Sequence, residues 1–178
     1  MTDYITTKDT AKLVRAALKS EYPGVKFSVR MSTGTASAWM NVSWSDGPTD
    51  AEVTAITSRF EGRKFNGMTD GCDNADTVLI ASEAGAMPRE VQYVCDGINT
   101  HRNYTAAGYA VAQNLISTDS DHKELVIFTP EGEAIAGAIL PTDIYVGGHF
   151  HDYIYSPESI ARSILHHVNI TAATVASR

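Results

Sequence analysis

Two histidines one residue apart, His149 and His151, form the strongest chemical pattern in the chain. Residues i and i+2 of a β-strand point to the same face, so both imidazoles would approach one ligand. Neutral imidazole binds transition metals, and Asp152, His166 or His167 would have to complete a set of three ligands. The spacing of His149 and His151 is common in proteins. His166 and His167 are expected on a helix, where adjacent residues diverge by about 100 degrees. We therefore expect no metal and no cofactor. The region of His149 and His151 is the basis of an alternative function, a small metal-dependent hydrolase or nuclease.

The two cysteines, Cys72 and Cys95, give a weaker indication of chemistry. They would need His101 to form a site, and the chain contains no Cys-x-x-Cys pair. Because the amino terminus lacks the basic and apolar regions of an export signal, we expect two thiols rather than a disulfide. The chain also lacks the Gly-x-x-x-x-Gly-Lys phosphate loop and the Gly-x-Ser-x-Gly nucleophile elbow. These patterns predict no catalytic residues and no motif-based nucleotide binding.

Acidic residues gather at Asp70, Asp73 and Asp76 in a chain whose net charge is -7. The 14 Lys and Arg residues are spread along the sequence, whereas direct nucleic-acid binding requires a basic face. Fixed carboxylates favour association with a basic groove on another protein, although a solvated acidic surface also keeps a protein soluble. We expect these three aspartates, with an exposed Trp39, to bind a protein partner. We expect no direct contact with nucleic acid or membrane.

The elements that position these residues are clearest in the first part of the chain. Apolar residues recur at three- and four-residue spacing in a first helix that starts near Thr7, and Tyr22-Pro23-Gly24 ends it. Residues 25–31 and 38–44 then alternate between apolar and polar side chains. This alternation predicts an antiparallel hairpin with one buried face and with Trp39 on the outer face.

A second helix begins after Thr49, because the side chains of Thr49 and Glu52 fit a capping box, and Gly62 ends it. Each element has one apolar face that must be covered, which predicts an α+β fold with an antiparallel sheet and with helices packed on one face. The residues expected in one shared core are Val14, Leu18, Phe27, Val29, Met40, Val42, Trp44, Val53, Ile56 and Phe60.

The run from Thr7 to about Thr105 resembles the family of large polyvalent protein associated domain 29. The resemblance is carried by four segments with the sequences Lys-Asp-Thr-Ala-Lys-Leu-Val-Arg, Pro-Gly-Val-Lys-Phe-Ser-Val-Arg, Trp-Ser-Asp-Gly-Pro-Thr and Phe-Asn-Gly-Met-Thr-Asp. It implies a protein of phages and of conjugative or other mobile elements. The family assigns no catalytic residues that transfer to this chain, so the resemblance implies a biological context without a mechanism.

The patterns after Asp76 are shorter. Residues 78–81 are predicted as a buried strand and residues 83–89 as a loop, and residues 91–95 alternate again before a turn at Asp96-Gly97. The first module is therefore expected to have a sheet of three or four strands.

Thr105 is predicted to cap a third helix, and residues 117–121 to form a loop or linker. A hairpin is expected around Pro130-Glu131-Gly132-Glu133, with residues 125–129 and 134–140 as its strands. A final helix follows Ser156-Pro157. Its inward residues are expected to be Ala161, Ile164, Leu165 and Val168.

We expect residues 1–105 to form the α+β module. Residues 106–178 are expected to form a smaller C-terminal extension packed on it.

The composition is that of an ordinary globular protein, with 43% hydrophobic and 20% charged residues among 178. No apolar run reaches the roughly 18 residues that a membrane span needs, so we expect a cytoplasmic protein. The resemblance, the acidity and the missing catalytic set together predict a non-enzymatic phage or mobile-element accessory protein. We expect it to bind a host protein through its acidic surface, and to inhibit a CRISPR or restriction-type defence nuclease. An inert structural or assembly module is a third possibility.

Overall fold

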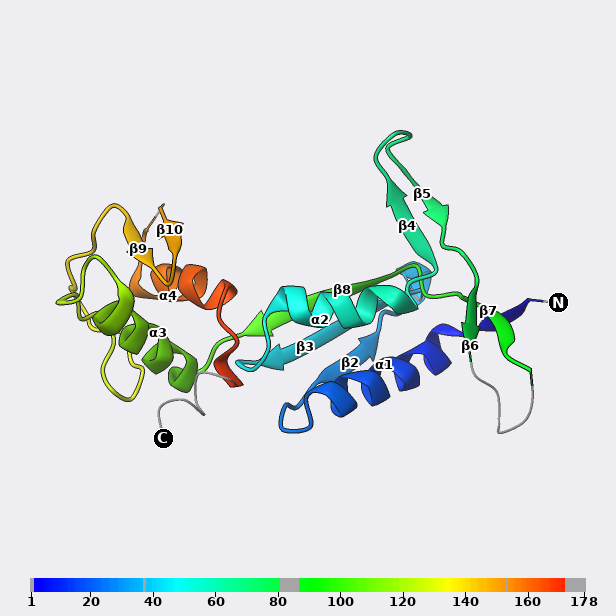
Figure 1. Ribbon diagram of the computed structural model, residues 1–178, viewed down its shortest axis with the longest axis horizontal. Coiled ribbons are helices and arrows are strands. Elements are labelled where there is room, and N and C mark those ends of the chain that lie inside the picture. Colours follow the sequence, from blue (N-terminus) through cyan, green and yellow to red (C-terminus); the bar gives the residue numbers. More distant parts are fainter. Residues whose placement is uncertain (1, 37, 81–86, 153, 172–178) are drawn as a thin grey trace. The chain divides into compact units, whose positions relative to one another are not determined.

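The computed structural model describes residues 2–36, 38–80, 87–152 and 154–171 (Figure 1). The chain divides into an N-terminal unit of residues 1–44 and 51–101 and a C-terminal unit of residues 45–50 and 102–178. Helices and strands are mixed in the chain, which confirms the predicted α+β class.

The N-terminal unit is built on a three-stranded sheet of β2 (Ser28–Met31), β3 (Trp39–Ser45) and β8 (Gly97–Asn103), in the order β2-β3-β8. β2 and β3 are antiparallel, as predicted. Helices α1 (Thr7–Glu21) and α2 (Asp50–Thr57) contribute to the same core as the inward side chains of β3, so both cover one face of the sheet (Figure 1). The core residues are Ala11, Val14, Leu18, Val29, Met40, Val42, Trp44, Val53, Cys95 and Ile98.

This core confirms the predicted set. Phe27, Ile56 and Phe60 pack against it while partly buried, and Trp39 points to the outer face of the sheet. Two details differ from expectation. Met31 is exposed at the end of β2. The α-helical part of α2 ends at Thr57 and continues as a 3-10 turn, η2 (Ser58–Phe60), before Gly62.

A second sheet of the N-terminal unit contains β1 (Asp3–Ile5), β7 (Arg89–Tyr93) and β6 (Val78–Ile80) in the order β1-β7-β6. β1 is parallel to β7, and β6 is antiparallel to it. The expectation of a buried strand at residues 78–81 was wrong in its burial: β6 lies at the edge of its sheet, and Val78 and Leu79 are exposed. Ala81 and residues 83–86 of the expected loop lie outside the described residues, and Arg89 already belongs to β7.

The C-terminal unit contains α3 (Ala106–Asp119), the hairpin of β9 (Ile144–Val146) and β10 (His149–His151), and α4 (Pro157–His166). Ser156 caps α4 as predicted, with Ser159 completing a capping box. The core residues are Ala112, Ile116, Ile127, Phe128, Ile144, Val146, Ile160, Ala161, Ile164, Leu165 and Ile170.

The loop predicted at residues 117–121 was wrong, because α3 continues to Asp119 and Ser120 forms a bridge with Val146. The expected strands around residue 132 are also reduced to a single bridge between Phe128 and Ala134. The side-chain carbonyl oxygen of Gln113 accepts from the amides of Ile127 (2.8 Å) and Phe128 (3.0 Å), which occupies donors that a strand ladder would use.

Arg102 organises the C-terminal unit by donating to four backbone carbonyls. Its guanidinium reaches the carbonyls of Asp46 (3.0 Å), Gly47 (2.8 Å), Leu165 (2.6 Å) and Val168 (2.9 Å). These bonds hold residues 46–47 against the end of α4.

None of the helices in the described ranges combines the length and the apolar character that a membrane crossing requires.

Candidate functional site

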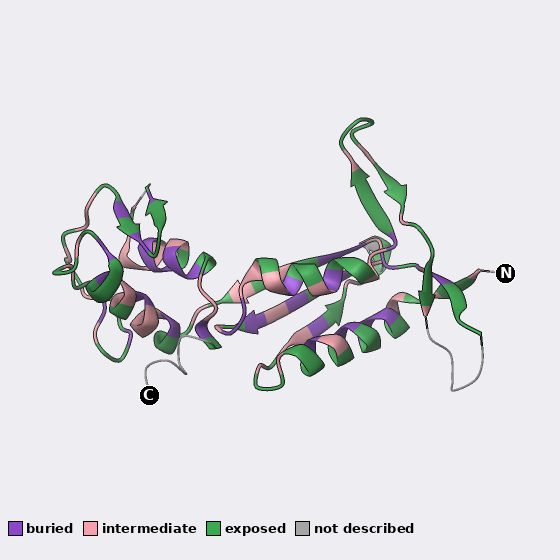
Figure 2. Cartoon of the chain, in the orientation of Figure 1, coloured by how far each residue is buried: buried purple, intermediate pink, exposed green. Residues whose placement is uncertain are grey.

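The hairpin of β4 (Arg63–Asn66) and β5 (Gly71–Asn74) is exposed along most of its length, and the sequence patterns did not predict it. Its strands are antiparallel and pair only with each other within the described part of the chain. Figure 2 shows exposed residues along nearly all of it. Both outer backbone edges of the hairpin are therefore without a neighbouring strand among the described residues.

The base of the hairpin is anchored at Gly62. The Gly62 amide donates to the Cys95 carbonyl (2.6 Å), and the Gly62 carbonyl accepts from the amide of Ala75 (2.8 Å). A Cβ at Gly62 would lie 1.9 Å from the Tyr93 carbonyl oxygen, so only glycine fits this close approach. The hairpin base is thus hydrogen-bonded to the segment that contains the core residue Cys95.

The tip of the hairpin is shaped by Asn66. Its side-chain carbonyl accepts from the amide of Met68 (3.0 Å), and its backbone carbonyl accepts from the amide of Thr69 (3.2 Å). Asp70 completes the turn with φ 49°, a left-handed conformation that aspartate tolerates better than most residues. These local bonds define the turn that presents Met68.

Two large apolar side chains of the hairpin face solvent. Met68 is 97% exposed at the tip, and Phe65 is 69% exposed on β4. Burial of either side chain against a partner would be favourable, so they are the strongest candidates for the affinity of an interface.

The predicted acidic residues Asp70, Asp73 and Asp76 are all exposed and lie on or beside this hairpin. Asp73 lies on β5 opposite Lys64 and accepts a hydrogen bond from the Asn66 side-chain amide (2.6 Å). The hairpin therefore carries basic residues beside its carboxylates, and Asp73 also has a structural role.

Trp39, the fourth predicted binding residue, is 42% exposed on the outer face of β3. Its ring lies over Gly97 of β8, where a Cβ would be 2.6 Å from the ring. The segment that includes Gly97 also anchors the hairpin base, because the Ile98 amide donates to the Glu61 carboxylate (2.8 Å). Burial raises the pKa of Glu61, an effect that the Ile98 N–H opposes. Trp39 and the hairpin base thus share one supporting segment.

The structure brings the predicted histidines together in the C-terminal unit. The rings of His149 and His167 stack with centroids 4.0 Å apart and planes within 7°, and His151 lies 6.1 Å from His167. His166 packs edge-on against His167 at 5.0 Å. Ring nitrogens point outward in the ring plane, so stacked rings do not direct them at one ion. Within the described ranges, no three His, Cys, Asp or Glu side chains are arranged to hold a metal.

His151 is the buried member of this cluster, with 3% exposure. Its Nδ1 lies 2.7 Å from the Ser163 hydroxyl, and its Nε2 has no hydrogen-bond partner among the described residues. Burial lowers the pKa of His151, the Val146 carbonyl opposes this shift, and His167 and His149 lower the pKa further. Burial and the neighbouring His149 and His166 also lower the pKa of His167. These surroundings favour the neutral forms of His151 and His167.

The cysteines lie in different surroundings. Cys72 is exposed on β5, whereas Cys95 is buried in the N-terminal core. Burial raises the pKa of the Cys95 thiol to about 11, so the reactive thiolate is rare at neutral pH. His101 is exposed on β8.

Comparison with known protein families gives a match to the first part of the chain. The family model described as large polyvalent protein associated domain 29 matches residues 5–105, more than half of the 178-residue chain. The matched stretch includes Trp39 and the β4–β5 hairpin, and the histidine cluster lies beyond it. No curated protein and no solved structure matches the chain.

Proposed function

The chain belongs to the large polyvalent protein associated domain 29 family, and from that premise we propose that it binds a host protein through the β4–β5 hairpin. Membership associates the chain with phages and mobile elements. The proposed role is that of a non-enzymatic accessory protein. The observation that carries the proposal is the exposed hairpin with Met68 and Phe65 in solvent.

The affinity would come from the apolar side chains. Full burial of a Phe or Met side chain is worth roughly 1.5–3 kcal/mol, and such residues concentrate binding energy at the centre of an interface. The open backbone edges of β4 and β5 also suit strand addition by a partner, since main-chain hydrogen bonds would satisfy them.

The partner class follows from charge. Asp70, Asp73 and Asp76 are exposed on or beside the same hairpin, and the whole chain has a net charge of -7. Carboxylates at the rim of an interface speed association with a basic surface. We propose that the partner is a nucleic-acid-binding host defence protein, and that occupation of its basic groove inhibits a CRISPR or restriction-type nuclease.

The experiment compares two double variants in a pull-down from defence-proficient host cells. Phe65→Ser with Met68→Ser removes the apolar side chains from the hairpin. Val126→Ser with Ile139→Ser makes a matched change at exposed positions of the C-terminal unit. We expect the hairpin variant to reduce capture of the partner about tenfold or more, and the control to leave it unchanged. Equal capture by the wild type and the hairpin variant would contradict the proposal.

A charge test refines the same proposal once a partner has been captured. Asparagine at Asp70, Asp73 and Asp76 should slow association and flatten its dependence on salt, with each charge contributing roughly 0.5–1 kcal/mol. Glutamine at three exposed glutamates of the C-terminal unit is the matched control. These are Glu124, Glu131 and Glu133. If the triple asparagine variant associates with the partner as the wild type does at both low and high salt, the aspartates do not belong to the interface.

A further inference from the structure

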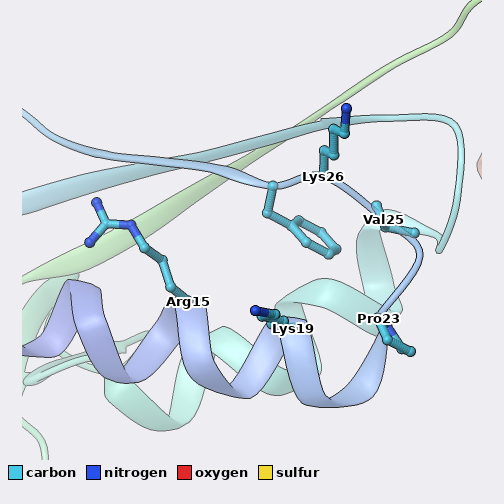
Figure 3. A pocket seen from close by; sticks show the side chains of 6 residues that line it. Arg15, Lys19, Pro23, Val25 and Lys26 are labelled. Carbon is cyan, nitrogen blue, oxygen red and sulfur yellow. The ribbon is translucent and has the colours of Figure 1, made fainter.

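The N-terminal unit contains a pocket of about 300 Å³ between α1 and the chain that leads into β2. Arg15 and Lys19 line it from the helix, and Pro23, Val25 and Lys26 line it from the segment that follows (Figure 3). Phe27 completes the lining. The volume is at the lower end of the range for small-molecule sites, which is the size of a mononucleotide rather than of a larger cofactor.

Three residues that line this pocket, Arg15, Lys19 and Lys26, are cationic, in a chain of net negative charge. Arg15 and Lys19 are four residues apart on α1, which places them on one face, and like charges in this arrangement are destabilising on their own. The Arg15 guanidinium donates to the Val29 carbonyl (2.6 Å), so one cation is held in place. Among the described residues, the ion pairs are Lys12 with Asp9 and Arg89 with Asp3, and neither includes a pocket cation.

The remaining wall is apolar. Phe27 is half-buried, and its ring is supported by Tyr22 at 6.2 Å and Trp44 at 5.7 Å between centroids. A ring that is held by two others offers a fixed apolar surface for a flat ligand. Val25 and Pro23 add further apolar contacts at the end of α1.

We propose that this pocket binds a small phosphorylated compound with an aromatic body, of the size of a nucleoside monophosphate. Arg15 and Lys19 would hold the phosphate, because charge-assisted hydrogen bonds from Arg and Lys are strong and a phosphate dianion matches two cations better than a carboxylate does. The aromatic body would lie against Phe27 and Val25. The chain has no phosphate-loop motif, so recognition would depend on side chains instead of backbone amides.

The cations are expected to contribute unequally. In Figure 3 the Arg15 and Lys19 side chains rise from α1, whereas the Lys26 ammonium points away from the helix. Lys19 should therefore contact the phosphate more directly than Lys26. The site is independent of the proposed protein interface, since no residue of the β4–β5 hairpin lines it.

The test is calorimetric titration of the full-length protein with AMP, adenosine and inorganic phosphate as separate probes. We expect AMP to bind more tightly than either component, and Lys19→Gln to weaken AMP binding about tenfold. Lys26→Gln should cause a smaller loss. Lys8→Gln is the matched control, because it removes the same charge from an exposed position of the same helix outside the pocket.

Unchanged thermal stability of Lys19→Gln would show that its loss of binding is not a loss of fold. Two results would overturn the proposal. AMP that binds no more tightly than inorganic phosphate would leave no role for the apolar wall, and equal losses in Lys8→Gln and Lys19→Gln would show unspecific attraction of anions.

Discussion

At the scale of single residues, His151 links solution pH to the stability of the C-terminal unit. Its pKa in the folded protein is lowered from 6.5, first by burial and then by the neighbouring His167 and His149. The unfolded chain therefore binds a proton at a higher pH than the folded chain does. The contribution of His151 to the free energy of unfolding should be constant well above pH 6.5 and fall as the pH drops from there toward the lowered pKa.

We predict that the melting temperature of the wild type decreases between pH 7.5 and pH 5.5, and that His151→Gln reduces this decrease. His122→Gln is the control, a histidine of the same unit outside the ring cluster. Thermal unfolding monitored by circular dichroism measures both. A wild type and a His151→Gln variant with the same pH dependence would contradict a titrating role for His151.

Alanine substitutions at Gly62 and Gly24 are expected to have different effects on the free energy of unfolding. A Cβ at Gly62 would lie 1.9 Å from the Tyr93 oxygen, whereas a Cβ at Gly24 has no atom within 4 Å. Because a backbone clash cannot relax by side-chain rotation, Gly62→Ala should lower the free energy of unfolding by about 2 kcal/mol or more. Gly24→Ala should change it by less than about 0.5 kcal/mol. Urea unfolding compares the two, and equal effects would refute the close approach at the hairpin base.

At the scale of elements, the predictable helices and strands are those with one buried face. α1 and α4 place apolar residues on one stripe, and β3 alternates through Met40 and Val42. The β4–β5 hairpin has no buried face and so no apolar period to read, although it is the candidate site. β8 was missed for a related reason, because it turns Thr100 toward α2 instead of an apolar residue.

The arrangement of the histidines and of the pocket residues could not be predicted from the sequence either. The period of a strand places His149 and His151 on one side, but the stacking of His167 on His149 depends on how α4 packs against β10. Arg15, Lys19 and Lys26 form no cluster in the sequence. The turn after α1 places Lys26 in the lining of the same pocket as Arg15 and Lys19. Contacts between elements are not encoded in local periodicity.

Arg102 is the element-scale anchor, since it connects the segment at Gly47 with the chain after α4. Arg102→Met would leave four carbonyls without this donor, and we expect the C-terminal unit to lose about 3 kcal/mol of stability. Arg162→Met, at an exposed position of α4, is the matched control and should have little effect. Chemical denaturation gives both values. A stability loss of Arg102→Met no larger than that of the control would refute the anchoring role.

At the scale of the whole molecule, a division at residue 105 is still a prediction. Every residue of the N-terminal core cluster, from Ala11 to Ile98, lies before that point. A fragment of residues 1–105 should therefore fold, with faster hydrogen exchange at residues 45–50, because this segment loses Leu165, Val168 and Ile170 as partners of Arg102 and Gly47. An unfolded fragment in circular dichroism would show that the two parts fold only together.

Photo-crosslinking from the hairpin tip in host cells tests most directly whether the β4–β5 hairpin binds a host protein. A photoreactive amino acid replaces Met68, which is 97% exposed, and in a separate protein it replaces Ile139, which is 91% exposed in the C-terminal unit. Binding through the β4–β5 hairpin predicts a discrete adduct with one host protein from position 68, reduced by the Phe65→Ser change, and no such adduct from position 139. Position 68 giving no adduct beyond that of position 139 would contradict the claim that the hairpin binds a host protein.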